Sequence, residues 1–297
     1  MPKVSVIIPT HNRSEFLKKS LVSVLNQTYQ DFEIIVVDDG IEKRADEVVN
    51  ELGDRRIIYL QHDVSRGGGA ARNTGIKSSL GQYIAFLDDD DEWLPNKLAT
   101  QMEKFENSLP EVGFCFCAVK NITNFGQERN YVPEGINDYY KLALSSFKKF
   151  LTVTLIIKKN VFDSVGLFDE TFPSHQESEL MIRVTAKFKG LGINEPLVLV
   201  NMKNDNQHVG GNLNKRIMGR ELLLKKHEDK FKKIPTAWAN HLFTLGVLYR
   251  QQQNYKLAEL NFKKAFCVDF KVRYFFHYLS MFKDGFLFRK FVFSYHH

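Results

Sequence analysis

Four consecutive aspartates, Asp88 to Asp91, directly follow the apolar run Tyr83 to Leu87, which is typical of a buried strand. Neighbouring carboxylates repel one another, so such a cluster at a strand end indicates that a positive group neutralises it. Magnesium and manganese prefer oxygen ligands and are usually held by one or two carboxylates together with water and substrate phosphates. The row therefore indicates a metal site for a phosphorylated substrate. A solvated acidic turn before a helix at residues 94–107 would produce the same pattern.

The elements that must position this row alternate between strands and helices through the first hundred residues. Apolar runs predict strands at residues 4–9, 33–37, 56–60 and 83–87. Helical spacing or charge predicts helices at residues 14–26, 42–52 and 70–79. Continuously apolar strands alternating with helices indicate an α/β fold with a parallel sheet covered on both faces.

Ligands of such sheets bind beyond the carboxyl ends of the strands. In this chain those ends carry Thr10 to Arg13, Asp38-Asp39 and Asp88 to Asp91. We therefore expect three polar strand ends to converge on one site.

Four segments in the same order resemble the signature segments of the family 2 glycosyltransferases, which have the GT-A fold. They are residues 4–13, 31–40, 69–76 and 83–93. The resemblance implies a mostly parallel, Rossmann-like sheet flanked by helices. It also implies a nucleotide-sugar donor, usually a uridine diphosphate sugar, bound at the first two strand ends, and Mn²⁺ or Mg²⁺ at a DXD motif.

The resemblance also assigns individual roles. Pro9, Thr10 and Arg13 would border the base and ribose, Asp39 would accept from the pyrimidine imide, and Arg72 would lie near the diphosphate or pyrimidine. Asp88 and Asp90 match the ends of the DXD motif, with Asp90 the direct metal ligand, Asp89 in the variable middle position and Asp91 following it.

Inversion at the sugar requires a base that takes the proton of the acceptor hydroxyl. Residues 176–183 resemble the family segment in which an acidic pair precedes a helix, and alignment on Leu180 and Arg183 places Glu177 where the family has its catalytic aspartate. This departure lengthens the side chain by one methylene. Glu177 and Glu179 could instead be ordinary charges at a helix start, and Asp169 and Glu179 are the next candidates for the base.

Two histidines and two cysteines are possible ligands. His175 and His208 could each bind substrate or the metal, and His208 lies in a polar stretch, residues 204–214, that could close over the diphosphate; a lone loop histidine is more often solvated. Cys115 and Cys117 alternate along an expected strand and are interpreted as core residues, because no zinc or disulfide spacing exists.

The chain changes character after residue 214. Residues 215–297 hold 17 Lys or Arg against 6 Asp or Glu, interleaved with aromatic residues. Residues 238–270 keep the spacing of one tetratricopeptide-like helix pair, which cannot bury its face alone. We therefore expect a glycosyltransferase domain at residues 1–214 and a basic helical region at 215–297. The helical region would contact an anionic membrane surface, a protein partner or a second copy. No nucleic-acid motif accompanies the charge.

Together with the patterns, the resemblance implies a metal-dependent, inverting glycosyltransferase of the bacterial surface-polysaccharide type, acting on a saccharide or lipid-linked saccharide. No signal peptide or apolar run of membrane-spanning length is evident, so we expect a cytoplasmic protein bound peripherally to the membrane. Two alternatives remain open. A nucleotidyltransferase would leave residues 176–183 without a role, and a catalytically silent scaffold would be consistent with the replacement at Glu177.

Overall fold

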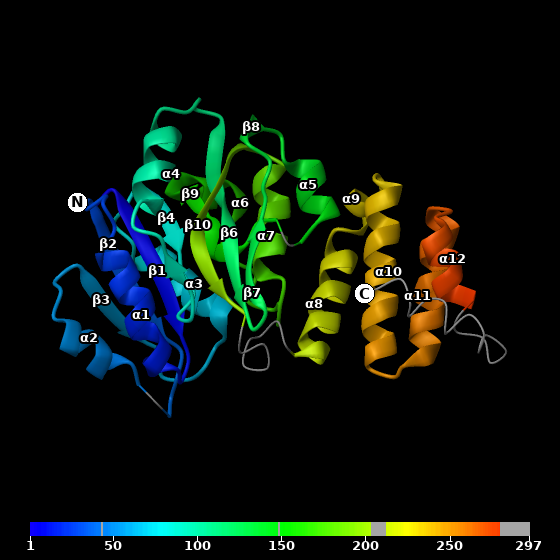
Figure 1. Ribbon diagram of the computed structural model, residues 1–297, viewed down its shortest axis with the longest axis horizontal. Helices are drawn as coiled ribbons and strands as arrows, with labels where there is room; N and C mark the ends of the chain where they lie inside the picture. Colours follow the sequence, from blue (N-terminus) through cyan, green and yellow to red (C-terminus); the bar gives the residue numbers. More distant parts are fainter. Residues whose placement is uncertain (43, 148, 203–211, 280–297) are drawn as a thin grey trace. The chain divides into compact units, whose positions relative to one another are not determined.

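The computed structural model describes residues 1–42, 44–147, 149–202 and 212–279 (Figure 1). The described residues fall into two compact units. The first is drawn from residues 1–143, 148–171 and 176–205, and the second from residues 144–147, 172–175 and 206–297. The expected division after residue 214 stays a prediction.

The first unit is built on one sheet. Its strands are β1 Val4–Thr10, β2 Phe32–Asp38, β3 Ile57–Gln61, β4 Tyr83–Phe86, β5 Glu92–Trp93, β6 Val112–Thr123, β7 Gly126–Asn130, β8 Gly135–Asn137, β9 Ile156–Lys158 and β10 Lys189–Asn201. The order along the sheet is β3-β2-β1-β4-β9-β6-β10-β5. The four amino-terminal strands are all parallel, and Thr10 pairs with Asp38 at the carboxyl end. The four predicted strands are therefore confirmed, and their polar ends share one edge.

The second half of the sheet is mixed. Strand β9 runs antiparallel to both β4 and β6, β10 is parallel to β6, and β5 is antiparallel to β10. The pairing of β5 explains why the helix expected from residue 94 begins later, at Lys97. Leu94 donates its backbone N–H to Leu197 O at 2.9 Å, which keeps that residue out of the helix.

Helices cover both faces of this sheet (Figure 1). They are α1 Ser14–Leu25, α2 Asp46–Leu52, α3 Gly68–Ser78, α4 Lys97–Glu106, α6 Lys159–Val165 and α7 Gln176–Thr185; a short helix, α5, spans Tyr140–Ser145, and a 3₁₀ turn spans Thr152–Thr154. Helix α3 approaches the sheet closely, because a Cβ at Gly75 would lie 2.5 Å from Ile7 Cγ2. The absence of a side chain at Gly75 therefore lets α3 pack tightly against β1.

The strands bury alternate residues in cores on opposite faces. Val4, Val6 and Ile8 lie in one cluster of buried residues, which also contains Cys115 and Cys117. Ile35 and Val37 pack with Ala71 of α3 in another cluster. The expectation that the two cysteines are core residues is confirmed, since both are buried and free.

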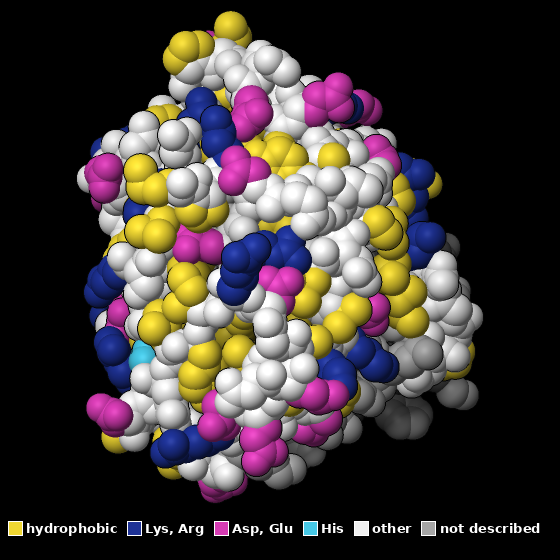
Figure 2. Space-filling model, turned by 90° about the vertical axis from the view of Figure 1, so that its left-hand side faces the viewer, with side chains coloured by type: hydrophobic (Ala, Val, Ile, Leu, Met, Phe, Trp, Pro, Cys, Tyr) yellow, Lys and Arg dark blue, Asp and Glu magenta, His cyan; other side chains and the backbone are white. Residues whose placement is uncertain are grey.

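Charges of both signs are interspersed over the face toward which β2, β3 and α2 lie (Figure 2). Among the described residues, no helix has the length and apolarity needed to cross a membrane.

The second unit is helical. It contains α8 Leu213–Lys226, α9 Glu228–Lys232, α10 Pro235–Gln251, α11 Tyr255–Val268 and α12 Val272–Leu279. Helix α11 begins after Asn254, whose side chain accepts from Leu257 N. Helices α10 and α11 pack closely at Gly246, where a Cβ would lie 2.6 Å from a ring carbon of Phe262. The expected helix pair is present, and its tetratricopeptide character stays a prediction.

Candidate active site

The aspartate row follows β4, and its four carboxyl groups differ in burial. Asp89 is fully buried and accepts from Thr10 Oγ1 at 2.8 Å, and Asp91 is buried and accepts from Asn201 N at 2.9 Å. The side chain of Asp88, by contrast, is 34% exposed. The Asp90 side chain is 8% exposed, so Asp88 is the most exposed of the four carboxyl groups.

Burial changes the protonation of the inner pair. Burial raises the pKa of Asp89 to about 7, against the opposing effect of the Arg13 charge, and it raises the pKa of Asp91 well above its ordinary value. The neighbouring carboxylates add to both shifts. The inner pair therefore takes up protons more readily than ordinary carboxyl groups do.

Two arginines neutralise the row. Arg13 bridges Asp89 and Asp90 at 2.7 and 2.8 Å, and Arg72 of α3 pairs with Asp88 at 2.6 Å. Two guanidinium groups therefore neutralise the row in this structure, whereas the sequence indicated a metal cation. The expected roles of Arg13 and Arg72 toward the donor stay predictions.

The carboxyl donor set is small. Among the described residues, no three His, Cys, Asp or Glu side chains are grouped as a metal site. Asp88 and Asp90 nevertheless suit the usual way of holding magnesium or manganese, in which one or two carboxylates act together with substrate phosphates. His208, the further candidate ligand, lies outside the described residues.

Asp39 lies at the end of β2 and is fully engaged by the loop that precedes α3. It accepts from Arg66 N and His62 Nδ1, both at 2.7 Å, and from Ser65 Oγ and Gly67 N, both at 2.8 Å. Burial would raise its pKa, but these hydrogen bonds outweigh burial and lower the pKa. Because four contacts fill the acceptor sites of a carboxylate, the loop would have to shift for Asp39 to accept from a pyrimidine.

His62 was not singled out from the sequence. Its Nε2 lies 2.8 Å from Thr74 Oγ1 of α3, so it links Asp39 to that helix. The one signal that could have identified it is its position directly after β3, since the ends of β1, β2 and β4 carry the other polar residues of the site. Thr10 is buried and Pro9 is half-buried at the end of β1.

Glu177 lies in the first turn of α7 and is half-buried. Burial raises its pKa, and the charges of Arg72 and Asp88 act on it, which places it near the acidic row. The neighbouring Gln176 accepts from Arg72 Nη1 at 3.2 Å. Arg72 therefore joins the end of β4 to the first turn of α7, where the predicted base lies.

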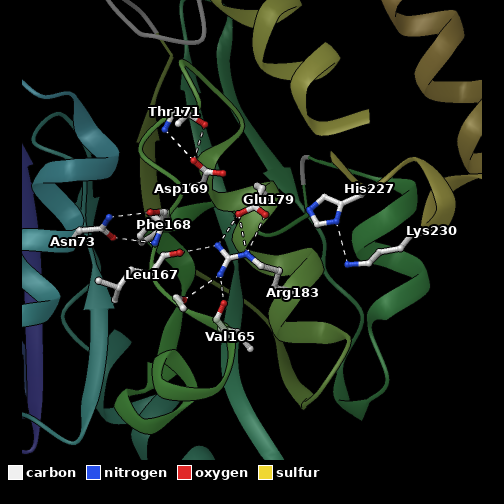
Figure 3. A network of polar contacts seen from close by, with 11 residues as sticks. Asn73, Val165, Leu167, Phe168, Asp169, Thr171, Glu179, Arg183, His227 and Lys230 are labelled. Atoms are coloured by element: carbon white, nitrogen blue, oxygen red, sulfur yellow. Dashed lines mark hydrogen bonds and ion pairs between the residues drawn. The ribbon is translucent and has the colours of Figure 1, made fainter. Parts of the chain in front are cut away.

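Glu179 and Arg183 form a buried ion pair within α7 (Figure 3). Arg183 Nη2 lies 2.6 Å from Glu179, and the guanidinium also donates to the carbonyl oxygens of Val165, Gly166 and Leu167. Glu179 is fully buried. Glu179 orients Arg183, which in turn holds the loop between α6 and α7 in place, so its role is structural.

Asn73 fastens the same loop to α3 (Figure 3). Its side-chain amide donates to Phe168 O and its oxygen accepts from Phe168 N, both at 2.9 Å, and the amide also donates to Glu170. The other candidate base, Asp169, accepts from the backbone and hydroxyl of Thr171. The sequence did not predict the roles of Asn73 and Glu170, because the residues that they contact lie about a hundred positions away.

His175 belongs to the second unit and is half-buried. Burial and the charges of Arg220 and Arg216 lower its pKa to about 3. Its role as a ligand of substrate or metal in the donor site stays a prediction.

The amino-terminal part of the chain is similar to known glycosyltransferases. Residues 5–166 match the family described as Glycosyl transferase family 2. An uncharacterized glycosyltransferase of Rickettsia bellii is 36% identical over 69% of this chain, and the match covers 29% of that protein. The GalNAc(5)-diNAcBac-PP-undecaprenol beta-1,3-glucosyltransferase of Campylobacter jejuni is 37% identical over 43% of this chain and 42% of its own length. The chain thus spans less than half the length of each of these two relatives.

Solved structures share the fold at low identity. Residues 1–349 of Staphylococcus aureus TarS, in complex with UDP-GlcNAc, match with a TM-score of 0.63 and 15% identity over 94% of this chain and 79% of that one. The mannosyltransferase PcManGT of Pyrobaculum calidifontis, in complex with GDP-Man and Mn²⁺, matches with a TM-score of 0.62 and 16% identity over 98% of this chain and 83% of that one. The predicted GT-A fold with additional carboxyl-terminal helices is confirmed.

Proposed function

Because the chain belongs to glycosyl transferase family 2, we propose that it transfers a sugar from a nucleotide diphosphate donor to a saccharide or lipid-linked saccharide acceptor, with inversion. A UDP-hexose or UDP-N-acetylhexosamine is the proposed donor, since the similar TarS structure contains UDP-GlcNAc. The name of the Campylobacter jejuni relative supports a lipid-linked acceptor. The observation that carries the proposal is Arg72, which joins Asp88 to the turn of α7 that bears Glu177.

In this proposal, Asp90 and Asp88 hold Mn²⁺ or Mg²⁺, as the manganese in the PcManGT complex suggests. When bound, the cation supplies positive charge to the diphosphate leaving group. Arg13 and Arg72 neutralise the same carboxylates in the present structure. With Asp88 engaged by the cation, Arg72 would be available to bind the anionic donor, whereas Arg13 would keep its ion pair with the buried Asp89.

Glu177 is the proposed base. A carboxyl group whose pKa is raised by burial is a stronger proton acceptor than an ordinary glutamate, provided that it is ionised. It takes the proton of the acceptor hydroxyl while the oxygen bonds to the anomeric carbon and the bond to the diphosphate breaks. The nucleoside diphosphate leaves with the electron pair of that bond, so inversion occurs in one displacement.

The remaining donor contacts follow the family resemblance. Pro9 and Thr10 would border the nucleoside, and Asp39 would accept from the pyrimidine after the loop that contains Arg66 and Gly67 shifts. Asp89 would hold Thr10 in position, because it is buried and accepts a hydrogen bond from the Thr10 hydroxyl.

The test is a panel of nucleotide sugars offered with manganese. A transferase releases nucleoside diphosphate slowly without an acceptor and faster with a suitable one. Formation of inorganic diphosphate would identify a nucleotidyltransferase, and neither product with any donor would favour the scaffold. Either of the last two results would overturn the proposal.

We also propose that the basic carboxyl-terminal region binds an anionic membrane surface, which would place the enzyme peripherally on the inner face of the cell membrane. In the described part of this region, Phe270 is 77% exposed and lies beside Lys271 in the sequence. Basic residues near an anionic surface contribute about 1 kcal/mol each, and salt weakens them. Co-sedimentation of the full chain with anionic and neutral vesicles tests this, and absence of binding to anionic vesicles at low salt would contradict it.

A further inference from the structure

Helix α8 of the second unit carries two arginines one turn apart, Arg216 and Arg220. Both guanidinium groups are charged at any relevant pH, and like charges at this spacing repel. Arg220 Nη1 donates to His241 Nδ1 at 2.8 Å, and its guanidinium lies 4.7 Å from the centre of the Phe147 ring. In the described part of the chain neither arginine has a carboxylate partner, and Arg220 Nε is buried without a hydrogen bond.

The histidine that contacts Arg220 brings no compensating charge. His241 Nε2 lies 2.7 Å from Leu144 O, and a carbonyl oxygen only accepts, so Nε2 carries the proton. His241 Nδ1 therefore accepts from Arg220 through a lone pair of a neutral ring. Burial lowers the pKa of His241 to about 3, in agreement with the neutral form.

A second neutral histidine lies in the same cluster. The ring of His175 is 5.3 Å from that of Phe147, and its Nε2 is buried with no hydrogen-bond partner. Arg220 and Arg216 both act electrostatically on it. The cluster therefore combines two uncompensated cations with a buried ring nitrogen that lacks a partner.

The backbone holds His175 in this position at a cost. Its φ of 61° lies in the left-handed region, which is unfavourable for a residue with a side chain. The preceding Ser174 donates to Lys215 O at 2.8 Å, and it lies so close to Gly219 that a Cβ there would overlap its hydroxyl. Contacts with α8 thus fix the strained residue beside the arginines.

We propose that Arg216, Arg220 and His175 bind a phosphate group, supplied either by free phosphate or diphosphate or by a lipid headgroup. A phosphate matches the cluster because it carries up to two negative charges and several acceptor oxygens, which two guanidinium groups and one imidazole N–H can share. A carboxylate would neutralise only one arginine. The proposed function uses none of these three residues, so the inference goes beyond it.

Calorimetric titration of the full chain with inorganic diphosphate, in metal-free buffer, tests the site. Arg216→Gln and Arg220→Gln should each weaken binding by about tenfold or more, as expected for the loss of a charge-assisted hydrogen bond. Lys225→Gln is the matched control, because it removes one positive charge from an exposed position on the same helix and should leave binding unchanged. Should Arg220→Gln fail to fold, Arg216→Gln decides the question, since no hydrogen bond holds the Arg216 side chain among the described residues.

A second arm, with water-soluble short-chain phosphatidate, identifies the source of the phosphate. Tighter binding of the lipid than of inorganic phosphate points to a headgroup, and binding of the inorganic anions alone points to free phosphate or diphosphate; both support the site if the arginine variants lose the response. No binding of any probe, or equal binding by all four proteins, would overturn the proposal.

Discussion

Replacement of Glu177 by glutamine separates proton transfer from binding. The amide has nearly the shape of the carboxylate, and the hydrogen bond that Glu177 accepts within α7 is a long one, 3.4 Å from Ser178 Oγ. Its loss should change folding stability by less than about 1 kcal/mol. The ion pair between Arg72 and Asp88 at 2.6 Å does not involve Glu177, so donor affinity should persist.

Turnover should fall steeply in the same variant. General-base catalysis contributes about 10²- to 10⁴-fold, so the barrier should rise by roughly 3–5 kcal/mol. The pH profile gives an independent readout. Because burial raises the pKa of Glu177 above its ordinary value of 4.5, and because the ionised form accepts the proton, wild-type kcat should increase with pH through that raised pKa. The glutamine variant should lack this rise.

Initial rates of acceptor-dependent transfer and the donor affinity of each protein measure both effects. Glu128→Gln, at an exposed position of β7, is the matched control and should behave as wild type. Equal turnover in Glu177→Gln and wild type, or an unchanged pH profile, would show that the base lies elsewhere.

Three further substitutions test other parts of the structure. Asp90→Asn should abolish the manganese-dependent part of donor binding, measured by calorimetry with and without chelator; wild-type affinity that ignores the chelator would contradict this. Glu179→Gln leaves the Arg183 charge without its buried partner and should cost about 3–5 kcal/mol in urea unfolding, so an unchanged midpoint would argue against a structural ion pair. Gly246→Ala places a methyl group 2.6 Å from the Phe262 ring and should destabilise by about 1–3 kcal/mol despite the better helix propensity of alanine, whereas a raised melting temperature would show that the helices can separate there.

Local patterns were enough to predict the framework of the first unit. A continuously apolar strand is recognisable over five or six residues, and alternation with helices implies parallel pairing, so β1 to β4 and their shared polar edge followed from neighbours in the chain. Cys115 and Cys117 are a second case, because alternation along a strand places both side chains on one face. The mixed second half was less predictable, since β9 and β10 pair with strands far away in the sequence.

The chemistry of the site depended on distant contacts that no local pattern encodes. In a row of four identical aspartates, the sequence does not indicate which side chains become buried. The hydroxyl of Thr10 and the backbone N–H of Asn201 select Asp89 and Asp91, and they lie 79 and 110 residues away. The loop that holds Asp39 through Arg66 N depends in the same way on a contact across 27 residues.

The positive charge near the acidic row likewise depended partly on the local sequence and partly on the tertiary structure. The four consecutive aspartates were enough to predict a positive charge at the end of β4, because adjacent carboxylates repel. Only the tertiary structure brought Arg13 from the end of β1 and Arg72 from α3 to that point. The sequence by itself determined that acidic side chains lie at the carboxyl ends of the strands, because these residues directly follow the apolar runs. The tertiary structure decided which basic side chains contact them, because those contacts depend on packing between residues far apart in the sequence.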